Sequence, residues 1–475
     1  MPDIAAQWEA HGRLRPVSET GQRVSGAALD VIGAAGEVGD TRRRFAFRRF
    51  RVDLSTTPGR LRLLLLVLVL LSLAWGSLAA FTVNQYSSAA SSVVAVREPL
   101  SLDAQQIYHD LSDADNTAAT AFLAGGLDPP AARKRYLADI HAAGTLLENA
   151  TARGGATLGS ASKDLATLST DLPIYAGEVE TARADNRQGY PLGAAYLREA
   201  SELMRRTLLP AANDMYAAEN ASLSAASGQA TGLPFVIATI AVGLGILIVV
   251  AWASRWLRRR THRVLNSGLL LAGAAAVISL VWLAVAYAGA RGDLQTAQSR
   301  GSAPVEALAR ADIAALQAHA DESISLINNG GDNGTYQAAY LRQQRALGPG
   351  AGTLLTLAET AATGSQASGG ATAAVGDAQS WFAAHAHLRT LDDNANHSAA
   401  VQSALGSGPN EAGTAFTKLS ADFAAGITAG QATFAARASA GANAFTGLEP
   451  GVIAAALVMA AGFAWGLSRR LAEYR

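Results

Sequence analysis

The run LRLLLLVLVLLSLAWGSLAAFTV, residues 61–83, decides the fold class of this chain. A helix needs about 20 mostly apolar residues to cross the hydrocarbon core of a bilayer, and this run supplies them. It begins at residue 61, too far from Met1 for the apolar core of a cleaved secretory signal. We therefore expect a retained membrane-spanning helix rather than a buried core helix.

Three further apolar runs, at residues 233–253, 268–289 and 450–467, have near-spanning length, and the last is the shortest. None of the runs holds an acidic residue or an interior arginine, which argues against a proton or ion pathway. The small residues of the third and fourth runs would allow close helix packing in the membrane. The sequence therefore predicts four transmembrane helices.

Arginine is distributed unevenly around these runs. Residues 42–62 hold eight arginines and one acid, and the linker 254–267 holds five arginines and no acid. Residues 84–232 hold 11 basic and 17 acidic side chains, and residues 290–449 hold 8 and 13. Because basic residues near membrane ends remain cytoplasmic, we expect a plasma-membrane protein with both termini inside and both long segments outside. The absence of cysteine fits exported segments that rely on no disulfide.

The two halves of the chain resemble each other. Residues 98–126, EPLSLDAQQIYHDLSDADNTAATAFLAGG, align with residues 303–331, so that Pro304 follows Pro99 by 205 residues and Gly330 follows Gly125 by the same 205. Further along, Tyr136 aligns with Tyr340 after a small shift in register. A conserved order of matches in the same membrane context indicates an internal duplication.

Each outside segment is rich in helix-forming residues and poor in the alternation that strands need. Turn signals in the first segment are Gly125–Pro130, Gly154–Gly155 and Gln188–Pro191, and in the second they are residues 330–334, 364–370 and 406–409. We therefore expect an all-α protein: four transmembrane helices with two extracytoplasmic up-down four-helix bundles related by internal duplication. The expected order is an N-terminal arm (1–60), span one (61–83), bundle one (84–232), span two (233–253), a basic linker (254–267), span three (268–289), bundle two (290–449), span four (450–467) and a tail (468–475).

The first helix of each bundle carries the candidate ligand-binding residues. Asp115 falls on a stripe formed by Tyr108, Leu111, Ala118 and Phe122, where a carboxylate needs a ligand amine, an arginine such as Arg133, or water. The second half has alanine at the matching position and acids next to it. The candidates are Asp113, Asp115, Asn116, Asp321 and Glu322. The alternative is that the acids of the first half only solvate a helix face or cap a bend.

Catalytic and cofactor motifs are missing from the sequence, which has no P-loop, GxGxxG, HExxH or GxSxG pattern. His385 and His387 are two residues apart and would point to different faces of a helix, so this pair alone is no metal site. Trp381, Phe382 and Tyr175 are expected in bundle cores. We therefore expect no enzyme, no cofactor and no metal.

The N-terminal arm contains the basic and aromatic cluster RRRFAFRRFRVD. Its position beside a span predicts contact with anionic lipid headgroups, and the alternative is an acidic cytoplasmic partner. Nucleic-acid binding is the more distant explanation. The residues concerned are Arg42, Arg43, Arg44, Arg48, Arg49 and Arg51.

The order of span, helical bundle and span, with DADNTAATAFLAGG in the first bundle helix, resembles the periplasmic sensor bundles of bacterial chemoreceptors and histidine kinases. The repeated unit, the Arg-rich arm and the absence of an output domain resemble the GlnX-type membrane component of actinobacteria. This resemblance implies that an amino-acid-binding lipoprotein contacts the bundles outside. It also implies that a Ser/Thr kinase of the protein kinase G type is engaged inside to adjust glutamate and nitrogen metabolism.

The leading hypothesis is a non-enzymatic transmembrane signal transducer that relays glutamate, aspartate or glutamine. An envelope scaffold or assembly protein without ligand control is the alternative. Transport comes third, because the spans lack midplane polar groups and broken helices.

Overall fold

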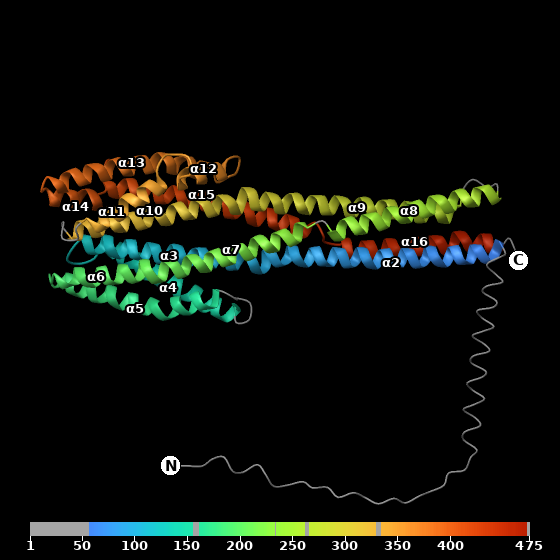
Figure 1. Cartoon of the computed structure of the whole chain (residues 1–475), viewed down its shortest axis with the longest axis horizontal. Coiled ribbons are helices and arrows are strands. Elements are labelled where there is room, and N and C mark those ends of the chain that lie inside the picture. Colours follow the sequence, from blue (N-terminus) through green and yellow to red (C-terminus); the bar gives the residue numbers. More distant parts are fainter. Residues whose placement is uncertain (1–56, 155–160, 233, 262–265, 329–333, 473–475) are drawn as a thin grey trace, which may run out of the picture.

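The computed structural model describes residues 57–154, 161–232, 234–261, 266–328 and 334–472. The secondary structure in these ranges is helical, without a strand, and the helices form one elongated body (Figure 1). The Arg-rich arm, for which lipid or partner contact was predicted, lies outside the described residues.

Four helices form one end of the body, on the right of Figure 1, and we call this end the apolar half. Each is long and apolar enough to cross a membrane. Large apolar side chains point outward from it, among them Leu70, Ile248 and Val285, which are 57%, 69% and 65% exposed. Exposing so much apolar surface is unfavourable in water and favourable in the hydrocarbon core of a bilayer, so the chain is a multi-pass membrane protein. The helices are α2 (Thr57–Ser92), α8 (Pro234–Thr261), α9 (Ser267–Ala297) and α16 (Leu448–Ala472).

Small residues set the helix contacts in the apolar half. A Cβ on Gly268 of α9 would lie 2.4 Å from the carbonyl oxygen of Gly462 on α16, and a Cβ on Gly76 of α2 would lie 2.4 Å from the Cβ of Ala456. The predicted close packing of the third and fourth spans is therefore present. It depends on positions where only glycine fits.

The first polar group of helices follows α2 and surrounds a core that includes Leu111, Tyr175 and Met204. Its last helical stretch returns toward the apolar half through α6, η2 and α7 (Figure 1). The elements are α3 (Glu98–Leu123), α4 (Pro130–Gly154), α5 (Ala161–Arg187), α6 (Leu192–Leu203), the π-helical η2 (Met204–Leu208) and α7 (Leu209–Thr231).

The second polar group follows α9 and packs around Trp381, Tyr340 and Phe423, all fully buried. Its elements are α10 (Ala303–Asn328), α11 (Thr335–Leu347), α12 (Leu354–Ala362), α13 (Ser368–Asp393), α14 (His397–Leu405) and α15 (Ala412–Asn443). Trp381 and Tyr175 are therefore core residues, as predicted, whereas Phe382 is half-buried.

Most turns lie at the positions that the glycine clusters in the sequence indicated. Gly125, Gly126, Gly189 and Gly364 all have positive φ, which glycine adopts without strain. The third break of the second segment, predicted at residues 406–409, is present, because residues 406–411 separate α14 from α15. A further turn at Asn394–Asn396, directly after α13, was not predicted.

Two π-helical segments join the apolar half to the polar groups. The segment η1 (Val93–Arg97) connects α2 to α3, and η3 (Gln298–Ser302) connects α9 to α10. Each segment is five residues long, and η3 begins 205 residues after η1. The helix is otherwise unbroken from Gly59 to Leu123 and from Ser267 to Asn328. Helices α3 and α10 therefore continue into the apolar half without an intervening loop.

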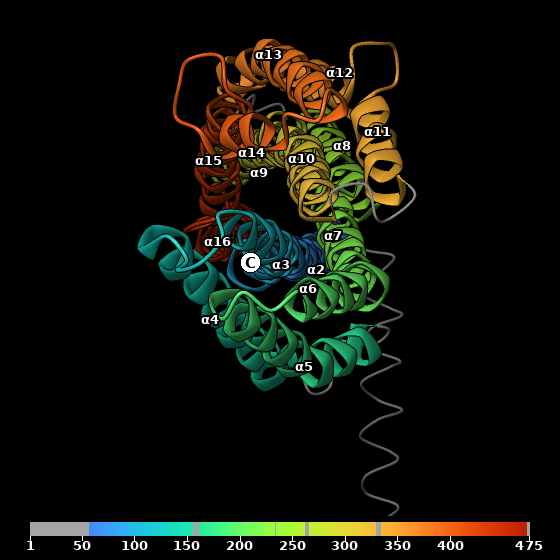
Figure 2. The same ribbon diagram turned by 90° about the vertical axis from the view of Figure 1, so that its left-hand side faces the viewer.

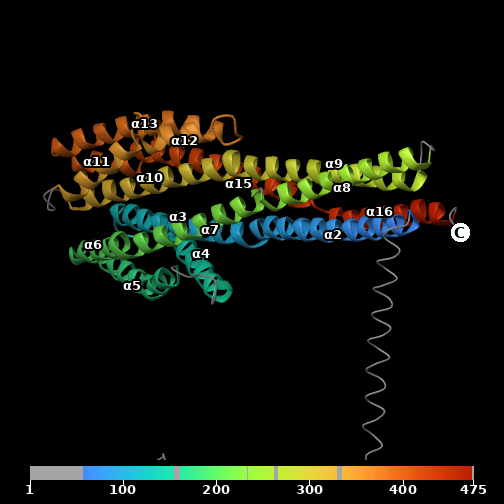
Figure 3. The same ribbon diagram turned by 45° about the vertical axis from the view of Figure 1, so that its right-hand side comes forward.

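The two polar groups meet along α3 and α10, which lie next to each other at the centre of the body (Figures 2 and 3). Helices α4 and α5 lie on the outer side of the first group, and α12 and α13 lie on the outer side of the second. The central contact between α3 and α10 is called the seam below.

Candidate functional site

The seam is polar although it is buried. His109 Nε2 lies 3.2 Å from Asp312 Oδ2, the His319 and Asn116 side chains are hydrogen-bonded at 2.7 Å, and Thr120 and Ser323 hydroxyls are 3.4 Å apart. The partners in all three pairs are separated by 203 residues. A constant separation means that α3 and α10 run parallel in a fixed register.

Arg205 on η2 links both sides of the seam. Its guanidinium forms an ion pair with Asp321 of α10, and its Nε lies 3.8 Å from Asp115 Oδ2 of α3. Ser201 also donates a hydrogen bond of 2.8 Å to Asp115. Burial raises the pKa of both carboxyls, that of Asp321 to about 6, and the positive charge of Arg205 opposes the rise. Arg205 therefore offsets the negative charge of two buried acids from opposite halves.

A second charged cluster lies where α4 joins the seam. Arg135 Nε donates a 2.6 Å hydrogen bond to the Asp113 carboxylate. Burial and the neighbouring acids Asp113 and Asp110 raise the pKa of Asp139 to about 8. Burial opposes protonation of His109, but its hydrogen bonds to Asp110 and Asp312 outweigh burial and raise its pKa to about 10. His109 is therefore a cation between two acids.

Histidines with different surroundings lie inside the second polar group. His385 Nδ1 is 2.5 Å from Glu322 Oε2, and its ring stacks on Tyr340 with centroids 3.5 Å apart. His319 stacks on Phe416 at 3.9 Å, and burial lowers its pKa. A neutral His319 can both accept and donate, which suits its bond to the Asn116 amide.

Two open clefts flank the seam. One, of about 510 Å³, lies between α7 and α11 and is lined by Arg205, Asp214, Asp321 and Arg342 among others. The other, of about 900 Å³, lies between α3–α4 and α14–α15 and is lined by residues that include Asn116, Arg135, His319 and Lys418. Both volumes lie in the range of small-molecule sites.

The cleft between α7 and α11, called the Arg205 cleft below, presents both signs of charge. Nε and Nη2 of Arg205 are buried and form no hydrogen bond with the described residues. Arg342 stands on the opposite wall, and Asp214 and Asp321 add carboxylates. Guanidinium groups bind carboxylates and carboxylates bind ammonium groups, so this lining can hold a zwitterion.

Residues 89–228 match the family model of an actinobacterial sensor domain. The matched range begins in the last turn of α2 and ends within α7. It includes Asp115, Arg205 and all of the first polar group except the end of α7. Neither a curated protein nor a solved structure matches the chain. The match supports a sensor-type actinobacterial protein with a sensing or signalling role.

Within the matched range, Asp113, Asp115 and Asn116 are 2%, 4% and 5% exposed, so a solvated helix face is excluded. Asp115 and Asp321 converge on Arg205, whereas Asp113 pairs with Arg135. Asn116 and Glu322 point toward histidines instead. The predicted candidates therefore belong to three separate clusters, with Asp321 alone among them lining the Arg205 cleft.

The predicted pairing of Arg133 with Asp115 is wrong. Arg133 bonds Glu180 of α5 at 2.5 Å, because α4 directs it away from the seam. Sequence reasoning also missed Arg205, His109 and His319. The available signal for Arg205 was a basic residue among apolar ones in MRRTLLP, at residues 204–210.

Among the described residues, no group of three His, Cys, Asp or Glu side chains is arranged to hold a metal ion. His385 is buried and His387 exposed, in line with the prediction that they face different directions.

Proposed function

We propose that the chain is a non-enzymatic transmembrane signal transducer. The observation that carries this proposal is the continuity of α2–η1–α3 and α9–η3–α10, which connects the seam to the apolar half without an intervening loop. Shifts of one to two ångströms between packed helices are a common form of signalling movement.

The two polar groups are proposed to be duplicated bundles on the outer side of the membrane. The equal spacing of the π-helical segments, 205 residues apart as in the sequence alignment, supports the duplication. The parallel seam has the arrangement expected where two copies of one unit pair about a twofold axis. The arginine-rich arm and linker support placing both termini in the cytoplasm.

The external cue is proposed to be glutamate, aspartate or glutamine, presented by a solute-binding lipoprotein as in GlnX-type systems. The mixed charges of the Arg205 cleft favour an amino acid over an apolar ligand. Asp113, Asp115, Asn116, Asp321 and Glu322 would respond to the cue by exchanging partners across the seam. Inside, Arg42–Arg51 would bind anionic lipid or a cytoplasmic kinase of the protein kinase G type.

Affinity purification of the tagged protein in mild detergent, followed by mass spectrometry, tests the relay. Recovery of a solute-binding lipoprotein together with a cytoplasmic kinase is the expected result. Recovery of envelope-assembly proteins alone would replace the relay with a scaffold.

Deletion of residues 1–56 tests the output, because α2 begins directly afterwards and all four spans are left intact, so we expect membrane insertion to be retained. We expect the response of nitrogen metabolites to external glutamate to be lost in the deletion strain. The full-length protein with its tag at the C-terminus is the control. An unchanged response with normal membrane levels would contradict a signalling role for the arm.

A further inference from the structure

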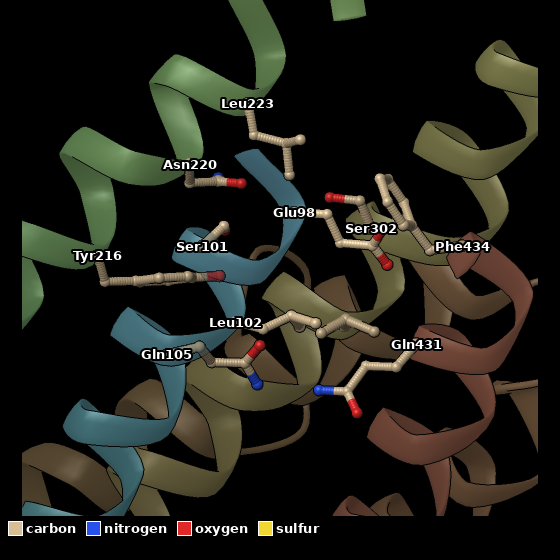
Figure 4. A pocket seen from close by; sticks show the side chains of 11 residues that line it. Glu98, Ser101, Leu102, Gln105, Tyr216, Asn220, Leu223, Ser302, Gln431 and Phe434 are labelled. Carbon is tan, nitrogen blue, oxygen red and sulfur yellow. The ribbon is translucent and has the colours of Figure 1, made fainter. Parts of the chain in front are cut away.

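A small cavity lies between the two halves directly after the π-helical segments, and we call it the junction cavity (Figure 4). Side chains reach it from α3 and α7 of the first half and from η3, α10 and α15 of the second. Its lining includes Glu98, Ser101, Gln105, Ser302, Gln431 and Phe434. Its volume of about 30 Å³ holds roughly one water.

Glu98 is the acidic residue of this lining, and no basic side chain among the described residues pairs with it. The carboxyl has neither an ion pair nor a hydrogen bond within the described ranges. Burial raises its pKa to about 7. Apolar groups from both halves, including Leu223, Val305 and Phe434, line the same space. A neutral carboxyl can remain there, whereas a charged one requires water.

The polar groups nearest to Glu98 are a phenol, an amide and an acid that already has a partner. Tyr216 of α7 is a phenol whose pKa burial raises above its usual range, and Asn220 donates to Glu306 of α10. Glu306 itself pairs with Arg310 at 2.6 Å.

Other charges close to the junction are Glu219 on α7, Arg97 on η1, the exposed Arg300 on η3 and Arg437 on α15. Burial raises the pKa of Glu219 and the charge of Arg97 lowers it. Arg437 pairs with Asp293 at 3.2 Å. Because Glu219 is also an acid, its variant is needed as a control.

Packing is tight on the side of the cavity that the second half forms. A Cβ on Gly301 of η3 would lie 2.7 Å from the Cβ of Phe434, and one on Gly430 of α15 would lie 2.6 Å from Val305 Cγ2. The helices of the second half are therefore locked together here. The cavity lies between these helices and α3, so a small change in the position of α3 would close or widen it.

We propose that Glu98 makes the junction between the halves responsive to protons: the neutral carboxyl lets α3 close on η3 and α15, and the ionised carboxyl admits water and separates them. The matching position of the second half is Ala303, so the response belongs to one half. This inference goes beyond the proposed function, since it requires no amino acid and no partner.

The chain contains no cysteine, so two spin labels can be placed without background. Ala95→Cys on η1 and Ala435→Cys on α15 are at exposed positions on either side of the junction. Label-to-label distances are measured in nanodiscs between pH 5.5 and pH 8.5 with no amino acid present. We expect two distance populations that exchange with a midpoint near pH 7.

Glu98→Gln imitates the neutral acid and should hold the low-pH distances at every pH. Glu98→Asp keeps a titratable carboxyl at this position and should still show the exchange between the two distance populations. Glu219→Gln and the exposed Glu202→Gln should titrate like the unmodified protein. Distances that do not change with pH, or a Glu98→Gln protein that still titrates, would overturn the proposal.

Discussion

Replacing Arg205 with methionine keeps most of the side-chain volume and removes the charge between Asp115 and Asp321. Both acids are buried, and their side chains are 5% exposed. Leaving a buried charge without its partner costs about 3–5 kcal/mol. Since about 1.4 kcal/mol corresponds to a tenfold change, amides of α3 and α10 should exchange hydrogen on the order of 10² to 10³ times faster.

The matched control is Arg206→Met, one residue further along η2. Arg206 is 78% exposed and pairs with Glu202 on the surface, a contact worth about 0–1 kcal/mol. Exchange in this variant should stay within about tenfold of the unmodified protein, by the same conversion. Equal exchange rates in the two variants would refute the conclusion that Arg205 offsets two buried charges.

The Arg205→Met effect should also depend on pH. The Asp321 carboxyl has a pKa of about 6 in the folded protein, compared with the ordinary value of 3.8 in an unfolded chain. It therefore binds a proton more tightly in the folded protein. Its contribution to stability therefore falls as pH rises from about 4 to about 6. Without Arg205 the pKa rises further, so the variant should be least impaired at pH 5 and most impaired at pH 8. Adding Asp321→Asn should restore part of the loss at pH 8.

Two further predictions concern the seam and the junction. His109 should remain protonated up to pH 8.5, whereas His319 should titrate below the usual histidine pKa, as read from ring signals in histidine-labelled protein. The stability that His109 contributes is complete below pH 6.5 and lost as pH rises toward 10, so titration of His109 near 6.5 would contradict its pairing with Asp312. Gly301→Ala should lower thermal stability by about 1–3 kcal/mol, because its methyl would meet the backbone of Phe434. Gly292→Ala, with nothing within 4 Å, should be neutral or stabilising, and equal melting temperatures would contradict close packing at η3.

The sequence predicted much of the helical fold, for reasons that are local. Apolar runs mark helices that lipid must surround, and glycines mark most of the turns. The turn after α13 was missed because it contains no glycine. Ala395 adopts the left-handed conformation there, with φ 61°, and the asparagines on either side carried a weaker signal than the glycines at 406 and 408.

The site could be predicted only in part. A carboxylate on an apolar stripe indicated that Asp115 is buried, and it is. The partner of that carboxylate depends on how α6, η2 and α7 return along α3, which no local pattern encodes. The pairing of Asn116 with His319 depends on the parallel register of two helices 203 residues apart. Long-range register is fixed by packing of the whole body and cannot be obtained from either helix alone.

The seam joins two stretches of a single polypeptide. Two separate subunits would have to encounter each other in the membrane, and the fraction paired would rise and fall with their abundance. Here α3 and α10 are covalently connected through α4–α9, so each meets the other at a fixed effective concentration. The pairing at Arg205 is therefore independent of how many copies the cell makes, and a change in it reports conditions at the protein rather than its expression level.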